Sequence, residues 1–98
     1  MTIKEIRDDS ALTLVVEGRL ETTTAPELDS VVKSKLEGIT SHAFDFSNLD
    51  YISSAGLRVL LTAQKIMNKQ GQMKIVGANE IVLEVFDITG FSDILTVE

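Results

Sequence analysis

Apolar residues recur at every second position near the start of the chain, which predicts two β-strands. Leu12, Leu14 and Val16 follow this alternation and would form one well-buried face. Residues 3–7 are a plausible earlier strand, and the polar residues 8–10 between the two segments favour a turn. Because this connection is short, we expect the two strands to pair as an antiparallel hairpin.

A first helix is predicted after the second strand. Gly18 is expected to end that strand, and residues 19–23 to form a polar loop. Thr24 and Glu27 have the spacing of a capping box, in which each side chain binds a free backbone N–H of the other residue. The apolar positions that follow at helical spacing are Leu28, Val31, Val32 and Leu36, before Gly38.

Strands and helices continue to alternate in the second half. Phe44 and Phe46 alternate around Asp45 and predict a third strand. A strongly apolar helix is expected from about Ala55 to Gln70, with Leu57, Leu60 and Leu61 buried against the sheet. The remaining expected elements are a strand over Met73–Val76, a helix capped by Asn79 and closed by Gly90, and an edge strand over Ile94–Val97.

The order β-β-α-β-α-β-α-β predicts one α/β domain over residues 1–98. From the second strand onward the alternation favours parallel pairing with right-handed crossovers, so we expect a mixed, mostly parallel sheet packed with helices. Loops that leave the carboxyl ends of parallel strands share one edge of the sheet, where ligands collect. That edge would bring together residues 18–23, 48–54 and 77–79.

Composition narrows the functions that this domain can have. A formal net charge of −6 disfavours nucleic acid and anionic membrane surfaces as direct partners. Without cysteine and with a single histidine, His42, the sequence predicts no metal site and no cofactor. No apolar run approaches the roughly 20 residues of a membrane span, and the first residues lack a signal-peptide pattern, so we expect a cytoplasmic protein.

Two adjacent serines stand at the start of the second predicted helix. Ser53 or Ser54 could simply cap the helix, because a hydroxyl accepts a hydrogen bond from a free N–H of the first turn. The helix needs only one cap, however, and Gly56 in its first turn leaves the backbone open to a close approach. Both interpretations, a cap and a functional site, stay open on these residues alone.

The segment Ile52-Ser53-Ser54-Ala55-Gly56-Leu57 resembles the signature of the STAS domain, the anti-sigma factor antagonist family. The family pattern has an Asp or Ser, then a phosphorylated Ser, a small residue and Gly-Leu. Gly18-Arg19-Leu20-Glu21 is similar to the first loop of the family, and Phe86-Asp87-Ile88-Thr89-Gly90-Phe91 to the end of a late helix of the family. The three segments occur in family order and spacing over nearly the whole chain.

This resemblance implies a STAS-like fold and a binding function without catalysis. Ser54 falls on the phosphoacceptor. The implied partners are an anti-sigma factor that is itself a serine kinase, which binds the unphosphorylated form, and a serine phosphatase that restores it. The positions expected to form the partner-binding surface are Glu21, Thr22, Thr23, Asp45, Asp50, Ser53, Ser54, Gly56 and Leu57. Asp45 could position or repel the phosphate, or could simply face solvent or a loop N–H.

Other function classes find less support in the sequence. The serines do not lie in a G-x-S-x-G elbow, which argues against a hydrolase, and no P-loop or G-x-G-x-x-G indicates nucleotide binding. The main alternative is a STAS subunit that docks on a membrane transporter or in a multiprotein sensory complex. Ser53, at a position where the family often has Asp, leaves this alternative open.

Overall fold

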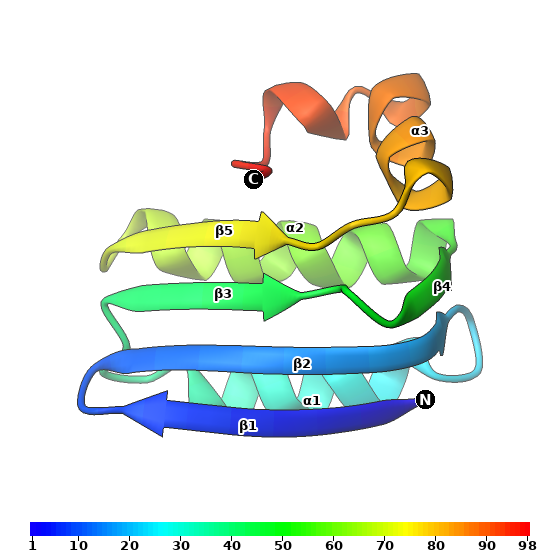
Figure 1. Ribbon diagram of the computed structural model, residues 1–98. Coiled ribbons are helices and arrows are strands. Elements are labelled where there is room, and N and C mark those ends of the chain that lie inside the picture. Colours follow the sequence, from blue (N-terminus) through cyan, green and yellow to red (C-terminus); the bar gives the residue numbers. More distant parts are fainter.

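A five-stranded sheet organises the chain, and two helices lie along one of its faces (Figure 1). The computed structural model describes residues 1–98. The elements are β1 Thr2–Asp8, β2 Ala11–Leu20, α1 Ala25–Lys35, β3 Ser41–Asp45, β4 Leu49–Ile52, α2 Ser54–Asn68, β5 Gln72–Val76, α3 Glu80–Thr89 and the short 3-10 helix η1 Phe91–Asp93. The helices α1 and α2 pack side by side on the sheet, whereas α3 lies beyond β5 and contacts β4.

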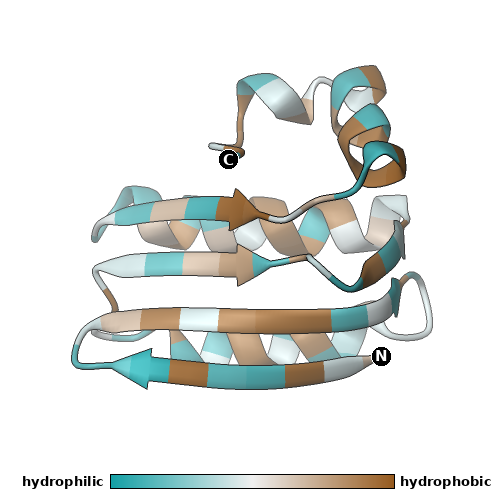
Figure 2. Cartoon of the chain, viewed as in Figure 1, coloured by the Kyte–Doolittle hydropathy of each residue, from teal (hydrophilic) through white to brown (hydrophobic).

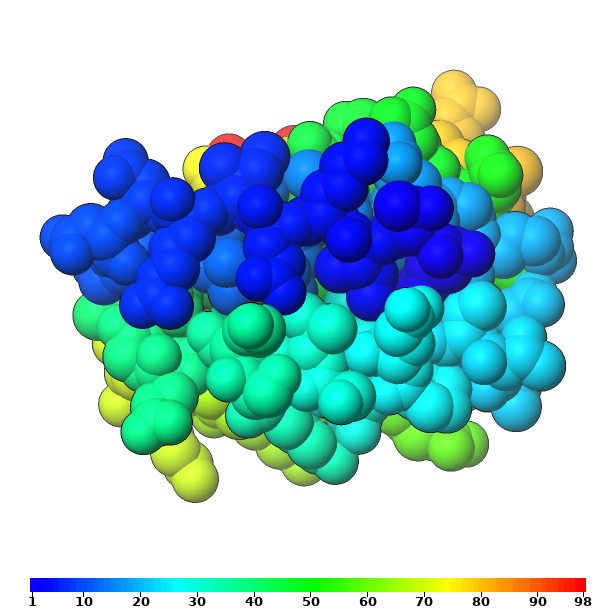
Figure 3. All heavy atoms as spheres, turned by 90° about the horizontal axis from the view of Figure 1, so that it is seen from below, coloured from blue at the N-terminus to red at the C-terminus, as the bar shows by residue number.

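The strand order is β1-β2-β3-β5, with β4 also paired to β2. β1 is antiparallel to β2, as the short turn predicted, and every other pairing is parallel. The predicted mixed, mostly parallel sheet is therefore confirmed. Figure 3 looks onto the edge formed by β1 and shows α1 lying along one side of it.

The core lies between the sheet and the pair α1 and α2. The apolar positions of β2 that alternate along the strand, Leu12, Leu14 and Val16, are buried, and Figure 2 shows β2 as more hydrophobic than the edge strand β1. From α2, Leu57 and Leu60 are buried as expected. Leu61 is only half-buried, so its predicted place in the core is wrong; it lies one residue, or about 100° of helical turn, beyond Leu60.

The fourth strand, β4, lies within residues 48–54, which were predicted to form a loop at the sheet edge. β2 does not end at Gly18 but continues to Leu20, and its last residues pair with Leu49–Ile52. Gly18 has φ +96°, and the pairing register shifts between it and Arg19. This bulge, at a residue that tolerates positive φ, lets β2 pair first with β3 and then with β4.

The predicted edge strand over 94–97 is wrong in extent. The segment after α3 forms η1, and only Val97 makes a bridge, parallel to Ile75 of β5. Two backbone hydrogen bonds hold it, from the Ile75 N–H to Thr96 O and from the Glu98 N–H to Ile75 O. The C-terminal residues thus lie against the outer edge of β5.

The capping box predicted at the start of α1 is also absent. Thr24 is the N-cap residue, but its hydroxyl makes no bond to the first turn of the helix. Its Oγ1 instead accepts from the Glu21 N–H at 2.9 Å and donates to the Arg19 carbonyl at 2.8 Å. Thr24 therefore shapes the preceding loop, and Ala25, Pro26 and Glu27 begin the helix without it.

Candidate functional site

The start of α2 brings Ser54 to the surface. Ile52 ends β4, Ser53 is the N-cap residue in extended conformation, and Ser54 is the first helical residue and is exposed. The Ser53 N–H donates to the Leu20 carbonyl at 2.9 Å, which fixes the start of the helix to the end of β2. A group on Ser54 would therefore meet the free N–H groups and the positive dipole end of a 15-residue helix.

The Ser53 hydroxyl does not cap α2, although Ser53 occupies the N-cap position. Its Oγ makes no hydrogen bond to the first turn and is buried without any partner. Of the two roles expected of Ser53, helix cap or loop geometry, a side-chain cap is therefore wrong, whereas its backbone bond to Leu20 shapes the start of the helix. The two serines differ clearly: the Ser53 hydroxyl points inward, while Ser54 stands at the surface.

Gly56 and Leu57 lie on the side of α2 that faces the sheet, and they offer little surface to a partner. Both are buried. A Cβ on Gly56 would lie 2.7 Å from Leu20 Cγ and 2.8 Å from Ile52 Cγ1. The close approach suspected at Gly56 is therefore made by the ends of β2 and β4, which lets the first turn of α2 rest directly on the sheet.

The loop between β2 and α1 lies beside this helix start. Thr22 and Thr23 are exposed there, and Glu21 is half-buried. The Glu21 carboxylate pairs with Arg19 at 3.0 Å, and the Arg19 guanidinium lies 4.7 Å from the centre of the Tyr51 ring in β4. The loop after β2 and the segment that leads into α2 thus lie at the same sheet edge, as the topology predicted. Arg19 connects them, because its side chain contacts both Glu21 and Tyr51.

A shallow groove of about 360 Å³ separates the beginnings of α1 and α2. The residues that line it are Thr22, Ala25, Pro26, Asp29, Ala55, Arg58, Val59 and Thr62. Arg58 is exposed and forms no ion pair, and it lies one helical turn after Ser54. The sequence predicts Arg58 on the solvent side of the helix, in a basic line that could be a docking strip or simply a solvated face. Its i+4 spacing from Ser54 is the signal that links it to this site.

The two aspartates of the predicted site have different places. The Asp45 carboxylate accepts hydrogen bonds from the Ser47 N–H at 2.9 Å and the Ser47 hydroxyl at 2.6 Å. These bonds stabilise the ionised form and lower the pKa of Asp45. Asp45 therefore shapes the turn from β3 into β4, whereas Asp50 is exposed on β4. Asp45 is the last residue of β3, and Asp50 lies in β4, the strand that leads into α2.

Comparison with known proteins agrees with this geometry. The family model described as STAS domain matches residues 2–98. The chain belongs to the STAS domain family. The resemblance seen in the motif around Ser54 is thus confirmed for the family, and nearly the whole chain is part of the match.

Relatives within the STAS family carry regulatory names. An anti-sigma-B factor antagonist from Staphylococcus epidermidis is 31% identical over 99 residues, covering 99% of this chain and 92% of the relative. The solved structure of the anti-sigma factor antagonist SpoIIAA in its unphosphorylated form superposes with a TM-score of 0.78 at 12% identity, covering 99% of this chain and 87% of that one. SpoIIAA in its phosphorylated form, from Bacillus, gives 0.77 at the same identity, with 99% and 91% covered.

The STAS fold also occurs in a protein of another kind. The structure of a sulfate transporter family protein from Wolinella succinogenes superposes with a TM-score of 0.79 at 17% identity, covering 94% of this chain and 79% of that one. At this identity the likeness concerns the fold alone. In the present chain no helix has the length and apolar character needed to cross a membrane.

Proposed function

We propose that this protein is an anti-sigma factor antagonist whose binding is switched by phosphorylation of Ser54. The unphosphorylated form binds an anti-sigma factor that is also a serine kinase, and so releases a sigma factor. Phosphorylation by that kinase ends the interaction, and a serine phosphatase restores it. The protein acts as a substrate and a binding module, not as an enzyme. The names of its relatives and its membership of the STAS family support this assignment.

The exposed position of Ser54 at the first turn of α2 is the observation that carries the proposal. The hydroxyl is accessible to a kinase, in contrast to the buried hydroxyl of Ser53. Thr22 of the neighbouring loop and Ala55, which follows Ser54, line the same groove, so a partner can cover this loop and the groove together with Ser54.

A phosphate on Ser54 would change the charge of this surface without unfolding the helix. It adds about −1.5 to −2 charges at pH 7. The N-terminus of α2 favours an anion, and Arg58 one turn later has no competing ion pair, so the protein tolerates the group locally. A partner that packs on the same surface would have to bury this strongly hydrated anion and strip its water. The affinity of the partner for the protein would therefore fall.

Calorimetric titration of the anti-sigma kinase tests this switch. We expect the unmodified protein and Ser54→Ala to bind equally, Ser54→Asp to bind more weakly, and the phosphorylated protein to lose roughly 1–3 kcal/mol of affinity. Part of that loss should shrink when the salt concentration is raised, because exposed charges are screened. Mass spectrometry should find the phosphate on Ser54 and none on Ser53.

Ser34→Asp is the matched control, because Ser34 is an exposed serine near the far end of α1. It changes the net charge of the protein by the same amount as Ser54→Asp does, and it should leave binding of the anti-sigma kinase unchanged. Equal affinities of the native and phosphorylated proteins would refute the switch. An equal loss with Ser34→Asp would show that net charge, not the site, controls binding.

A second candidate function is a STAS subunit of a membrane transporter or of a multiprotein sensory complex. The superposition with the sulfate transporter family protein from Wolinella succinogenes is the observation that supports this second function. The two functions predict different partners. Purification of the tagged protein from its own cells would recover an anti-sigma kinase in the first case and a transporter or sensory assembly in the second.

A further inference from the structure

Four of the five large hydrophobic residues that the protein exposes lie in one short segment, α3 and the residues after it. They are Ile81, Leu83, Ile88 and Ile94. Single exposed hydrophobic residues are common on protein surfaces, but a group of them on one element indicates a contact site. α3 stands outside the layers formed by the sheet and by α1 and α2, and much of its surface is therefore open to solvent (Figure 1).

One apolar stripe along α3 consists of Ile81, Val85 and Ile88. Their spacing of four and three residues places them on the same side of the helix, next to the side that buries Val82 and Phe86. Val85 is half-buried, whereas Ile81 is 57% and Ile88 is 76% exposed. Neither isoleucine is among the residues that form the core or pack against it. The stripe is thus an apolar surface that the fold itself does not use.

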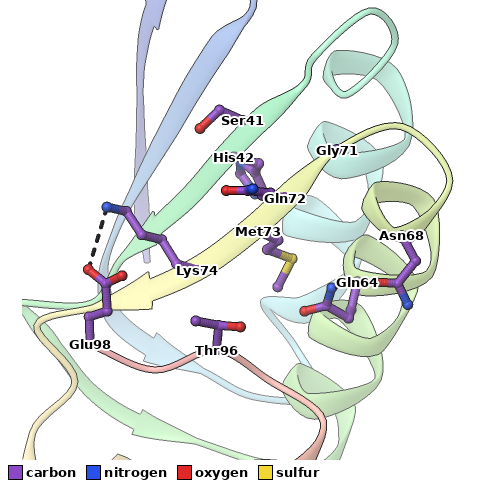
Figure 4. A pocket seen from close by; sticks show the side chains of 10 residues that line it. All are labelled: Ser41, His42, Gln64, Asn68, Gly71, Gln72, Met73, Lys74, Thr96 and Glu98. Atoms are coloured by element: carbon purple, nitrogen blue, oxygen red, sulfur yellow. Dashed lines mark hydrogen bonds and ion pairs between the residues drawn. The ribbon is translucent and has the colours of Figure 1, made fainter.

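The outer side of α3, beside this stripe, is acidic. Its exposed positions opposite the buried side are Glu80, Glu84 and Asp87, and none of these carboxylates forms an ion pair. Lys74 is the last basic residue of the chain, and it already pairs with Glu98 at 3.5 Å (Figure 4). The surface of α3 therefore combines exposed apolar side chains with negative charge that no cation of this chain neutralises.

This combination restricts what can cover the stripe. A second copy of the chain would bring two sets of unpaired carboxylates together, and like charges repel. A helix that binds a membrane surface carries basic residues beside its apolar side, and an anionic lipid surface repels an acidic helix. The matching surface for an apolar stripe bordered by negative charge is an apolar stripe bordered by positive charge.

We propose that α3 is a docking surface for a partner protein that presents a basic amphipathic helix. The apolar side of that helix packs against Ile81 and Ile88, and its lysine or arginine side chains pair with Glu80 and Glu84 at the rim of the contact. α3 has 10 residues and is about 15 Å long, so about three turns of the partner helix cover it. This inference does not rest on the proposed function at Ser54.

A synthetic amphipathic peptide of leucine and lysine, about 14 residues or roughly four helical turns long, is the probe. Titrated into the full-length, ¹⁵N-labelled protein, it should shift the backbone amide signals of α3 in a saturable manner. Ile88→Gln should weaken this binding about tenfold, because glutamine suits a helix but removes the apolar contact. Glu84→Gln should weaken binding several-fold and reduce its dependence on salt. Ile88→Gln should keep the native melting temperature, since Ile88 lies outside the core.

Ile6→Gln is the matched control, because Ile6 is 59% exposed but lies on the edge strand β1. It should bind the peptide like the native protein. An equal loss of binding with Ile6→Gln and Ile88→Gln, or no saturable binding of the peptide at all, would overturn the docking surface.

The other possible occupants of the stripe give different results. Equal binding of a peptide with glutamate in place of lysine would show that charge does not select the partner, and would overturn its assignment as basic. Dimers of the native protein in analytical ultracentrifugation that Ile88→Gln abolishes would assign the stripe to a second copy of the chain. Flotation of the protein with phosphatidylcholine vesicles that Ile88→Gln abolishes would assign it to a membrane. Either result would overturn the proposal.

Discussion

At the scale of single residues, the start of α2 differs from the start of α3 in the use of its N-cap. Ser53 has a hydroxyl suited to capping, yet its Oγ is buried and unpaired. Asn79 caps α3 fully: its Oδ1 accepts from the Val82 N–H at 2.8 Å, and its Nδ2 donates to the Leu49 carbonyl at 3.0 Å. Residue type alone does not reveal this difference, because it depends on which neighbours surround the side chain.

Alanine at these two positions should have opposite consequences. Asn79→Ala should lower the free energy of unfolding by about 1–2 kcal/mol, since it removes a cap and the bond from Asn79 to Leu49 O. Ser53→Ala should leave that free energy within about 0.5 kcal/mol of the native value or raise it, because a buried unpaired hydroxyl is removed. Urea denaturation of both variants measures the difference. A loss above about 1 kcal/mol for Ser53→Ala would mean that its hydroxyl is bonded in solution.

At the scale of elements, α2 joins the site to the core. Its first turn carries Ser54 at the surface and Gly56 against the sheet, while Leu60, Ala63 and Met67 continue the buried face. The boundary of that face is sharp, since Leu60 is fully buried and Leu61 is not.

Leu60→Ala and Leu61→Ala therefore form a matched pair on one helix. We expect Leu60→Ala to destabilise the protein by on the order of 2–5 kcal/mol, because it leaves a cavity in the core. Leu61→Ala should cost about 1 kcal/mol or less, since its side chain is only partly buried and lies outside the core cluster. Thermal and urea unfolding would measure both. Equal losses would show that the buried face of α2 is turned by one residue from the structure described.

The elements differ in how well sequence patterns predict them. The hairpin and the three helices follow from periodic apolar positions, and the strands β3 and β5 follow from short apolar stretches. β4 escapes prediction because it has four residues, and its neighbours Asn48 and Asp50 are typical of turns. It forms only because the bulge at Gly18 extends β2 alongside it. The predicted last strand is reduced to one bridge at Val97, because η1 takes up the preceding residues.

At the scale of the whole molecule, the candidate site was largely predictable from topology. The loops after β2, β4 and β5 share one edge, as expected of parallel strands, and the family motif indicates Ser54 within it. Arg58 and the groove between α1 and α2 were not predictable, because they depend on how two helices distant in sequence pack together.

Buried His42 gives the whole molecule a pH-dependent stability. Its pKa in the folded protein is lowered, mainly by burial, from an ordinary value of 6.5. Below about pH 6.5 the unfolded chain therefore takes up a proton that the folded protein does not. The free energy of unfolding should fall as the pH drops from there toward the folded-state pKa, by at most about 1.4 kcal/mol per pH unit, and should show no contribution from His42 above that range.

His42→Asn keeps a side-chain donor for the Leu12 carbonyl but cannot titrate, so it is the control. Urea unfolding of both proteins between about pH 5.5 and 7.5 should show the slope in the native protein and its loss in the variant. The window lies above the range in which Asp45 matters, because the pKa of that carboxyl is lowered from 3.8 by its bonds to Ser47. An identical slope in both proteins would contradict the assignment to His42.

The two outer strands of the sheet also bear on self-association. An unpaired strand edge is a template on which another chain can add a strand, and charged side chains or a covering segment prevent this. β1, which forms one rim of the molecule in Figure 3, carries Lys4, Glu5 and Arg7 along its exposed length. The edge of β5 is covered at Ile75 by the bridge to Val97. Both ends of the sheet are thereby protected against the growth of intermolecular β-structure, and loss of the last few residues would expose the edge of β5 to aggregation.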